Sequence, residues 1–352
     1  MKVSIGTNIK EGPWGGGNLF AKNLMKSLTQ NGHQAFNNLN EKDLDIILIT
    51  EPRKTSESSA FTYDDVKNYL KYINSNAIVL HRINECDERK QTNYVNKYLI
   101  HTNKIADSTI FVSTWLKNLY HEQNIQSKES HVIMAGADNT VFNSTNKNLW
   151  DGKNKLKIVT HHWGANWNKG FDIYLALDKL LGNDQYKEKF EFTYIGNIPK
   201  EVNFKNTEVI SPLSGHDLAE KIKESHVYLT ASLNEPSGNH HIEGAQCGLP
   251  LLYINSGGIP EYCDGFGIIF DTHNFEDCLN KIHDDYFYFE KKINSYPNNS
   301  EKMGLEYISL FENMLSNKNS YINKRDKKLY NKNNLEKFIY LNKRKIKGFK
   351  KV

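Results

Sequence analysis

Two glutamates in the second half of the chain have the spacing of a site that handles phosphate and hydroxyl groups. Glu235 and Glu243 are separated by seven residues, and Pro236, Ser237 and Gly238 mark a turn before the helix-like segment HIEGAQC. Helical positions lie about 100° apart, so the two carboxylates do not share one face, and we expect Glu235 before the helix and Glu243 on it. The first amides of the helix would then receive a diphosphate, while Glu243 would accept two hydrogen bonds from a ribose diol. The alternative is that Glu235 caps the helix and Glu243 forms a surface ion pair.

Two other loops place basic or small residues at the start of a predicted helix. GANWNKG precedes FDIYLALDKLL, which puts Lys169 in or near the first turn, where its charge adds to the positive end of the helix. GPWGGGN, with Gly16 and Gly17, precedes LFAKNLMKSLTQNGH and allows close approach of a ligand to backbone amides. Taken singly, the lysine also fits a solvated surface residue and the glycines a tight turn without a ligand.

These loops follow apolar runs that alternate with helix-like stretches. KVSIGT, LDIILIT, AIVLHRI and STIFVS precede a polar stretch at 143–155, after which KLKIVTHHW, FEFTYIGN, TEVISPL, HVYLTAS and PLLYIN restart the pattern. Such alternation predicts parallel sheets with helices on both faces, and 352 residues suit two domains. We expect an N-terminal Rossmann-like domain over 1–145, a C-terminal one over 146–320 and a basic tail over 321–352. Ligands should bind beyond the carboxyl ends of the strands.

Composition excludes several classes of protein. Four cysteines lie far apart without a CxxC pair, which predicts neither a zinc site nor a disulfide framework. The N-terminus lacks the apolar core of a signal peptide, and no stretch approaches 18 apolar residues. No nucleic-acid-binding module accompanies the basic tail. We therefore expect a cytoplasmic protein that binds no nucleic acid.

Charge is unevenly distributed along the chain. The net charge is +4, yet residues 321–352 contain twelve Lys/Arg and two acids, which leaves the remainder near −6. If residues 335–350 are helical, the apolar residues share about 100° of arc and lysines flank them; they are Leu335, Phe338, Ile339, Ile346 and Phe349. Such a helix can lie on an anionic membrane as a peripheral anchor. The alternatives are that the stripe packs against the protein's own body, that the tail is disordered, or that it is a solvated charge run.

The ordered set of loops resembles the family 4 retaining glycosyltransferases, also called group 1, which have the GT-B fold. EPSGNHHIEGAQCGLP is similar to the E-x7-E segment of that family, and AGADNTVF, NKGFDIYLAL and SGGIPEY resemble other segments of it, in order, up to about Leu315. The resemblance implies that Glu243 holds the donor ribose, Glu235 faces the transferred sugar and Lys169 binds the diphosphate. It also implies phosphate and sugar contacts from the amides of two segments: Gly16 and Gly17, and Ser237, Gly238, Asn239 and His240.

The resemblance fails at one charged position. The family commonly places an arginine shortly before the phosphate-binding lysine, but HHWGANWNKG contains none. Either Lys169 acts with His162, Trp163 or Asn168, or a cation reaches the diphosphate from across the cleft. We take Arg82, in IVLHRINECDERK, as the candidate for that cation. His81 beside it fits either an acceptor-facing role or a hydrogen-bonded core histidine.

The predicted function is transfer of a sugar from a nucleoside-diphosphate sugar to a hydroxyl of a glycan, lipid-linked or other acceptor. A fixed lysine and a helix N-terminus can stabilise the leaving diphosphate without a metal, and the chain lacks the paired aspartates of a DxD site. The adjacent histidines 240 and 241 lack a third ligand at suitable spacing. We therefore expect no cofactor and no metal. The alternatives are a GT-B epimerase or hydrolase of sugar nucleotides and an inactive GT-B nucleotide-binding subunit.

Overall fold

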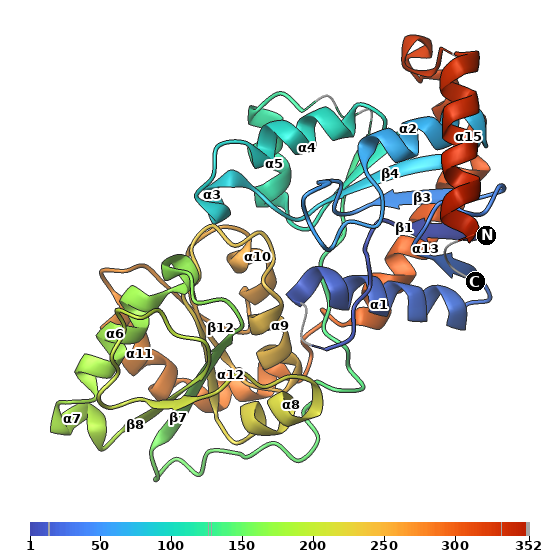
Figure 1. Cartoon of the computed structure of the whole chain (residues 1–352). Coiled ribbons are helices and arrows are strands. Elements are labelled where there is room, and N and C mark those ends of the chain that lie inside the picture. Colours follow the sequence, from blue (N-terminus) through green and yellow to red (C-terminus); the bar gives the residue numbers. More distant parts are fainter. Residues whose placement is uncertain (13–14, 126, 128, 332, 350–352) are drawn as a thin grey trace.

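The computed structural model consists of two α/β domains (Figure 1). It describes residues 1–12, 15–125, 127, 129–331 and 333–349, with the backbone alone for residue 343 and residues 345–349. Each domain is built on a six-stranded sheet in which every pair of neighbouring strands is parallel. The predicted α/β fold class is therefore confirmed.

The N-terminal sheet has the strand order β2-β1-β3-β4-β5-β6. Most of its central strands are fully buried, because helices cover both faces of a parallel sheet. Its strands are β1 (Lys2–Ile5), β2 (Gln34–Phe36), β3 (Ile46–Ile49), β4 (Ile78–Ile83), β5 (Ser108–Phe111) and β6 (Ser130–Val132). Its helices are α1 (Gly15–Gln30), α2 (Tyr63–Tyr72), α3 (Asp87–Lys90), α4 (Val95–Asn103) and α5 (Thr114–Glu122).

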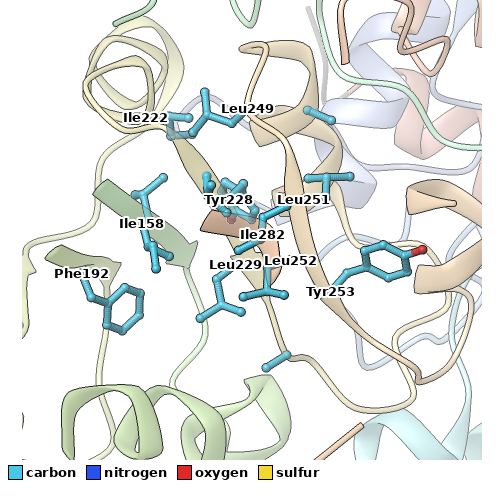
Figure 2. Packing of buried hydrophobic residues seen from close by; sticks show 14 of the residues in the cluster. Ile158, Phe192, Ile222, Tyr228, Leu229, Leu249, Leu251, Leu252, Tyr253 and Ile282 are labelled. Carbon is cyan, nitrogen blue, oxygen red and sulfur yellow. The ribbon is translucent and has the colours of Figure 1, made fainter. Parts of the chain in front are cut away.

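The C-terminal sheet has the order β12-β11-β10-β7-β8-β9, and its apolar side chains form one large core (Figure 2). Its strands are β7 (Leu156–His162), β8 (Phe190–Gly196), β9 (Glu208–Ile210), β10 (Val227–Thr230), β11 (Leu251–Ile254) and β12 (Gly267–Phe270). Its helices are η1 (Trp167–Lys169), α6 (Phe171–Leu180), α7 (Asp184–Lys187), α8 (Gly215–Lys223), α9 (Asn239–Gln246), α10 (Ile259–Cys263), α11 (Phe275–Asp284) and α12 (Tyr286–Ile293).

The strand order fixes where a ligand can enter the C-terminal domain. From β7 the chain moves outward through β8 and β9, and then crosses back to β10 on the other side of β7. The loops after β7 and β10 therefore diverge, and a crevice opens between them at the carboxyl edge of the sheet. Lys169 lies on the first of these loops and Glu235 on the second, so the topology brings them together.

The chain returns to the N-terminal domain after α12, which corrects the predicted boundary at residue 320. Helix α13 (Ser300–Ser316) packs against α1, and its side chains Met303, Tyr307 and Phe311 are buried in the N-terminal core. The sequence pattern could not separate this helix from α12, because its apolar stripe is compatible with either core. The C-terminal domain therefore ends near residue 299 rather than at 320.

The C-terminal segment continues along the N-terminal domain through α14 (Lys318–Asn323), η2 (Lys327–Tyr330) and α15 (Asn334–Phe349). Arg325 is buried and donates to the Asp107 carboxylate with its Nε at 2.8 Å, while Leu329 and Tyr330 pack on the nearby core. The first ten residues of the predicted tail are thus part of the domain body. Within the part of the chain that the structure describes, no helix is both long enough and apolar enough to span a membrane.

Candidate active site

A cavity of about 610 Å³ lies in the cleft between the domains. This volume is in the range of pockets that enclose a small molecule or cofactor. All ten residues predicted for the site line this one cavity; they are Gly16, Gly17, Arg82, Lys169, Glu235, Ser237, Gly238, Asn239, His240 and Glu243. The sequence motifs, although far apart in the chain, thus converge on a single space.

Glu235 lines this cavity and forms ion pairs with two cationic side chains. Its Oε2 accepts a hydrogen bond from Lys169 Nζ at 2.8 Å, and its Oε1 accepts one from Arg89 Nε at 2.8 Å. Lys169 comes from the C-terminal domain and Arg89 from α3 of the N-terminal domain. Helix α9 begins after Gly238 without a side-chain cap, so Glu235 is not the capping residue that the alternative interpretation required.

The three charges hold one another in their ionised forms. Burial alone would raise the pKa of the Glu235 carboxyl, but Lys169 and Arg89 outweigh burial and hold that pKa well below its usual range. The charge of Glu235 raises the pKa of the Arg89 guanidinium. Burial lowers the pKa of the Lys169 amine, and the nearby Glu235 opposes this effect. Because the group contains two cations and one anion, the group itself carries a net positive charge.

Glu243 lies on α9 and is also buried, with 5% of its surface exposed, so it does not form a surface ion pair. Its Oε2 is 2.8 Å from His161 Nε2, and the other ring nitrogen of His161 is 2.9 Å from the Tyr228 hydroxyl. Among the described residues no hydrogen bond reaches Glu243 Oε1. This carboxylate is therefore fixed by the end of β7 with one oxygen left for a ligand.

The first turn of α9 faces the glycine-rich start of α1 across the cleft. A Cβ atom on Gly16 would lie 3.1 Å from Asn239 Nδ2, so a larger residue at position 16 would crowd the opposite domain. Gly238 adopts a φ of +71°, and a Cβ there would lie within 2.9 Å of Glu235 and of two histidine rings. Both glycines thus permit close packing around helix starts whose first amides lack intrahelical acceptors.

Four buried histidines lie beside these residues: His161, His162 and His240 line the cavity, and His241 lies next to His240. The His162 and His240 ring centres are 4.5 Å apart, and those of His240 and His241 are 4.9 Å apart. His162 contacts the Tyr174 hydroxyl at 2.7 Å and His240 contacts the Thr230 hydroxyl at 2.7 Å. Burial holds the pKa of the His162 and His240 rings well below the usual value, so both are neutral. No cluster of potential metal ligands occurs among the described residues.

Arg89 is the charged residue that the sequence interpretation missed. Arg82, the residue proposed in its place, is 4% exposed, and its guanidinium lies 3.8 Å from the Phe20 ring centre. His81 is fully buried on β4, with Nδ1 3.1 Å from Asn103 Oδ1, as a core histidine would be. Arg82 lies near the end of β4, and Arg89 lies on α3, which follows that strand. Arg89 was discernible only from the charged segment DERK, which forms a short helix one turn beyond the strand end.

Known proteins resemble this arrangement in sequence and in fold. Residues 181–286 match the family model of glycosyl transferases group 1. The chain has the GT-B fold, and the part of it over residues 181–286 is similar to the group 1 glycosyl transferases. The predicted fold is confirmed, and the predicted resemblance to this family of transferases is confirmed over the matched residues.

Solved structures resemble the fold of the chain over nearly its whole length. Anabaena Alr3699/HepE in complex with UDP has a TM-score of 0.65 at 11% identity, covering 89% of this chain and 99% of that one. Sucrose-phosphate synthase from Thermosynechococcus elongatus has a TM-score of 0.63 at 12% identity, covering 90% of this chain and 99% of that one. At such identities the likeness establishes the fold alone.

A curated relative matches a shorter region. The gpi3 subunit of the Schizosaccharomyces pombe phosphatidylinositol N-acetylglucosaminyltransferase is 23% identical over 150 residues, which are 39% of this chain and 32% of the relative. The match thus spans about a third of the length of that relative.

Proposed function

We propose that this group 1 protein is a retaining, family 4 glycosyltransferase that transfers a sugar from a nucleoside-diphosphate sugar to a hydroxyl acceptor. The observation that carries the proposal is the convergence of Glu243, Lys169 and the start of α9 on one interdomain cavity of about 610 Å³. The cavity can hold the ribose, the diphosphate and the sugar of one donor molecule beside these residues. No metal is needed in this scheme.

Each part of the cavity would meet one part of the donor. Ile195, Leu213 and Leu218 form an apolar wall suited to a nucleobase, and Glu243 Oε1 would accept hydrogen bonds from the ribose diol. The diphosphate would lie against Lys169 and the first amides of α9. Glu235 would then face the hydroxyl groups of the transferred sugar.

The chemistry follows from the charge that develops on the leaving group. The departing diphosphate becomes more negative in an oxocarbenium-like transition state, and the fixed lysine and helix amides stabilise that charge. We assign no side chain as a covalent nucleophile. The acceptor would attack from the face that the diphosphate leaves, with the leaving phosphate assisting deprotonation of its hydroxyl.

A Glu243→Ala variant is expected to lose nucleotide binding. Wild type should be stabilised by one of UDP, GDP or ADP in a thermal-shift screen, since ligand at 100 times its Kd adds about 2.7 kcal/mol. Loss of charge-assisted hydrogen bonds to the ribose should weaken the affinity for that nucleotide about tenfold or more. Glu201→Ala, which removes an exposed glutamate of the same domain, is the control.

Several outcomes of this screen would contradict the proposal. Equal affinities in the Glu243→Ala and wild-type proteins would remove the ribose assignment, and the absence of any nucleotide binding would remove the function. Sugar released from the donor without an acceptor would indicate a hydrolase or epimerase instead, and binding without turnover an inactive subunit. All assays are run with EDTA, and recovery of activity only with Mg²⁺ or Mn²⁺ would refute the metal-free site.

We further propose that α15 attaches this cytoplasmic enzyme to an anionic membrane, so that the acceptor is lipid-linked. Helix α15 contacts the N-terminal domain through one face, where Glu336 pairs with Lys71 at 2.7 Å and Tyr340 packs against Tyr72. Leu335, Phe338 and Ile339 project from the other side and are 68%, 66% and 44% exposed. Figure 1 shows the helix along the outer edge of that domain.

Charge complementarity favours an anionic membrane as the partner of this exposed face. The stripe belongs to a segment with twelve basic and two acidic residues, while the rest of the chain is slightly acidic. Anionic lipid attracts such a segment by about 1 kcal/mol for each basic residue near the surface. The side chains of Ile346 and Phe349, predicted to extend the stripe, and all of residues 350–352 lie outside the described part of the chain.

A triple variant Leu335→Ser, Phe338→Ser and Ile339→Ser is expected to lose most of its binding to anionic liposomes, by about fivefold or more, in sedimentation at low salt. Wild type should bind anionic but not neutral vesicles, and high salt should weaken the binding. Phe287→Ser with Tyr288→Ser removes exposed rings from the other domain as a control. Equal binding by the triple variant and wild type would disprove the membrane proposal. Deletion should begin at residue 331, because residues 321–330 are packed in the domain.

A further inference from the structure

Helix α3 of the N-terminal domain is held by the donor-side loops of the C-terminal domain. Asn168 Nδ2, on the loop after β7, donates a hydrogen bond to the Arg89 carbonyl. Asn234 Nδ2, on the loop after β10, donates to the Glu88 carbonyl at 3.4 Å. Together with the ion pair between Arg89 and Glu235, these contacts hold α3 against both loops.

The position of Arg89 is also set from within its own domain. The Asp87 carboxylate accepts hydrogen bonds from the amides of Val95 at 2.9 Å and Asn96 at 3.0 Å, which ties α3 to the start of α4. Lys90, the other base at this end of α3, is engaged by Glu85 at 2.6 Å. Arg89 is therefore the base of α3 that is presented to the cavity.

The group formed by Glu235, Lys169 and Arg89 has the charge to attract an anion. Glu235 neutralises only one of its two partners, Lys169 and Arg89, so the group retains a net charge of about +1 next to the first turn of α9. A guanidinium presents several donors in a plane and binds phosphate oxygens well. A ligand that brings two negative phosphates can attract both cations away from Glu235.

We propose that Arg89 binds the donor diphosphate as a second cation, supplied from the N-terminal domain across the cleft. This inference rests on the proposed function, because it assigns a residue to the diphosphate of the same donor. In the ligand-free protein Arg89 and Lys169 are both hydrogen-bonded to the Glu235 carboxylate. When the donor binds, both move to the phosphates, and Glu235 is released toward the sugar.

The test compares affinities for a nucleoside diphosphate and for its nucleoside, using whichever of UDP, GDP or ADP stabilises the wild type. Arg89→Ala should weaken nucleoside-diphosphate binding at least tenfold and leave nucleoside binding within about twofold, while Arg89→Lys should retain part of the affinity. Lys97→Ala removes an exposed charge from α4 and should bind both ligands as wild type does.

A second comparison separates phosphate binding from an indirect effect through Glu235. In a Glu235→Gln background, Arg89→Ala should still cost at least tenfold in diphosphate affinity. If that loss disappears, Arg89 acts only as a partner of Glu235 and the inference is wrong. It is equally wrong if Arg89→Ala binds the diphosphate as wild type does, or weakens nucleoside and diphosphate alike. A wild type that binds none of the three nucleotides would instead refute the proposed function.

Discussion

A Glu235→Gln variant is expected to turn over at least a hundredfold more slowly than wild type while binding the free nucleoside diphosphate more tightly. The carboxylate competes with the diphosphate for Lys169 and Arg89, to which it is hydrogen-bonded at 2.8 Å on each side. Its neutral isostere would free both cations for the phosphates. The same change removes a charged contact to the reacting sugar, and loss of one such electrostatic contact typically costs about 10² to 10³ in kcat.

The opposite signs of the two effects make this experiment decisive. Affinity is measured by titration calorimetry and turnover with saturating donor. Glu191→Gln, at an exposed position on β8, controls for loss of one negative charge from the domain. Unchanged turnover would show that Glu235 makes no important contact to the reacting sugar. Weaker diphosphate binding would show that Glu235 does not compete with the diphosphate for Lys169 and Arg89. Glu235→Ala is less informative, because it removes the hydrogen-bond acceptor and the buried side-chain atoms that the isosteric glutamine keeps.

Much of the fold could be predicted from the sequence because its strands are short apolar runs separated by loops with clear helix starts. The E-x7-E segment placed Glu235 before α9 and Glu243 on it, as found in the structure. Helix α13 was assigned to the wrong domain, since an amphipathic pattern shows that a helix is buried but not against which core. The predicted domain boundary is therefore wrong at the point where the chain crosses back to the N-terminal domain.

The charged partners in the site were harder to predict than the loops. Arg82 near the end of β4 and Arg89 on α3 lie seven positions apart, and both line the cavity. Only the three-dimensional path of α3, set by the bonds to Asp87, turns Arg89 toward Glu235 and leaves Arg82 against Phe20. Likewise, Tyr321 and Arg325 were predicted to lie in a tail, but their contacts to Glu129 and Asp107 anchor that segment to the domain.

The buried histidines have a consequence for stability that is independent of the ligand. Burial lowers the pKa of His81 to about 4, of His226 to about 4 and of His241 to about 3. Both ring nitrogens of His241 are buried without a hydrogen-bond partner. The charged groups around that ring are Glu235, which favours its protonation, and Lys169, which opposes it. The folded protein thus resists protonation at positions that bind protons readily once unfolded.

The free energy of unfolding is therefore expected to fall steeply as the pH decreases from about 6.5 to 4. Above pH 7 these histidines are neutral in both states and contribute no pH dependence. Below their unfolded pKa near 6.5, the unfolded chain takes up protons that the folded chain does not, so each histidine costs up to about 1.4 kcal/mol per pH unit. By pH 4, one histidine with a folded pKa near 4 has lowered the free energy of unfolding by on the order of 3 kcal/mol. The summed loss from several such histidines approaches the whole stability of a typical domain.

Urea unfolding at pH 7.5 and pH 5.5, followed by circular dichroism, measures this effect, and a His241→Leu variant isolates one contributor. The variant should lose less stability than wild type between the two pH values, by about 1 kcal/mol, because it removes one group that only the unfolded chain protonates. His273→Leu, at an exposed position, should show the wild-type pH dependence. Glu235 cannot mimic the effect, because its pKa lies well below the usual range and its contribution is lost only at more acidic pH. A wild-type stability that does not change between pH 7.5 and 5.5 would contradict this prediction, because it would mean that these buried rings take up protons in the folded protein as readily as in the unfolded chain.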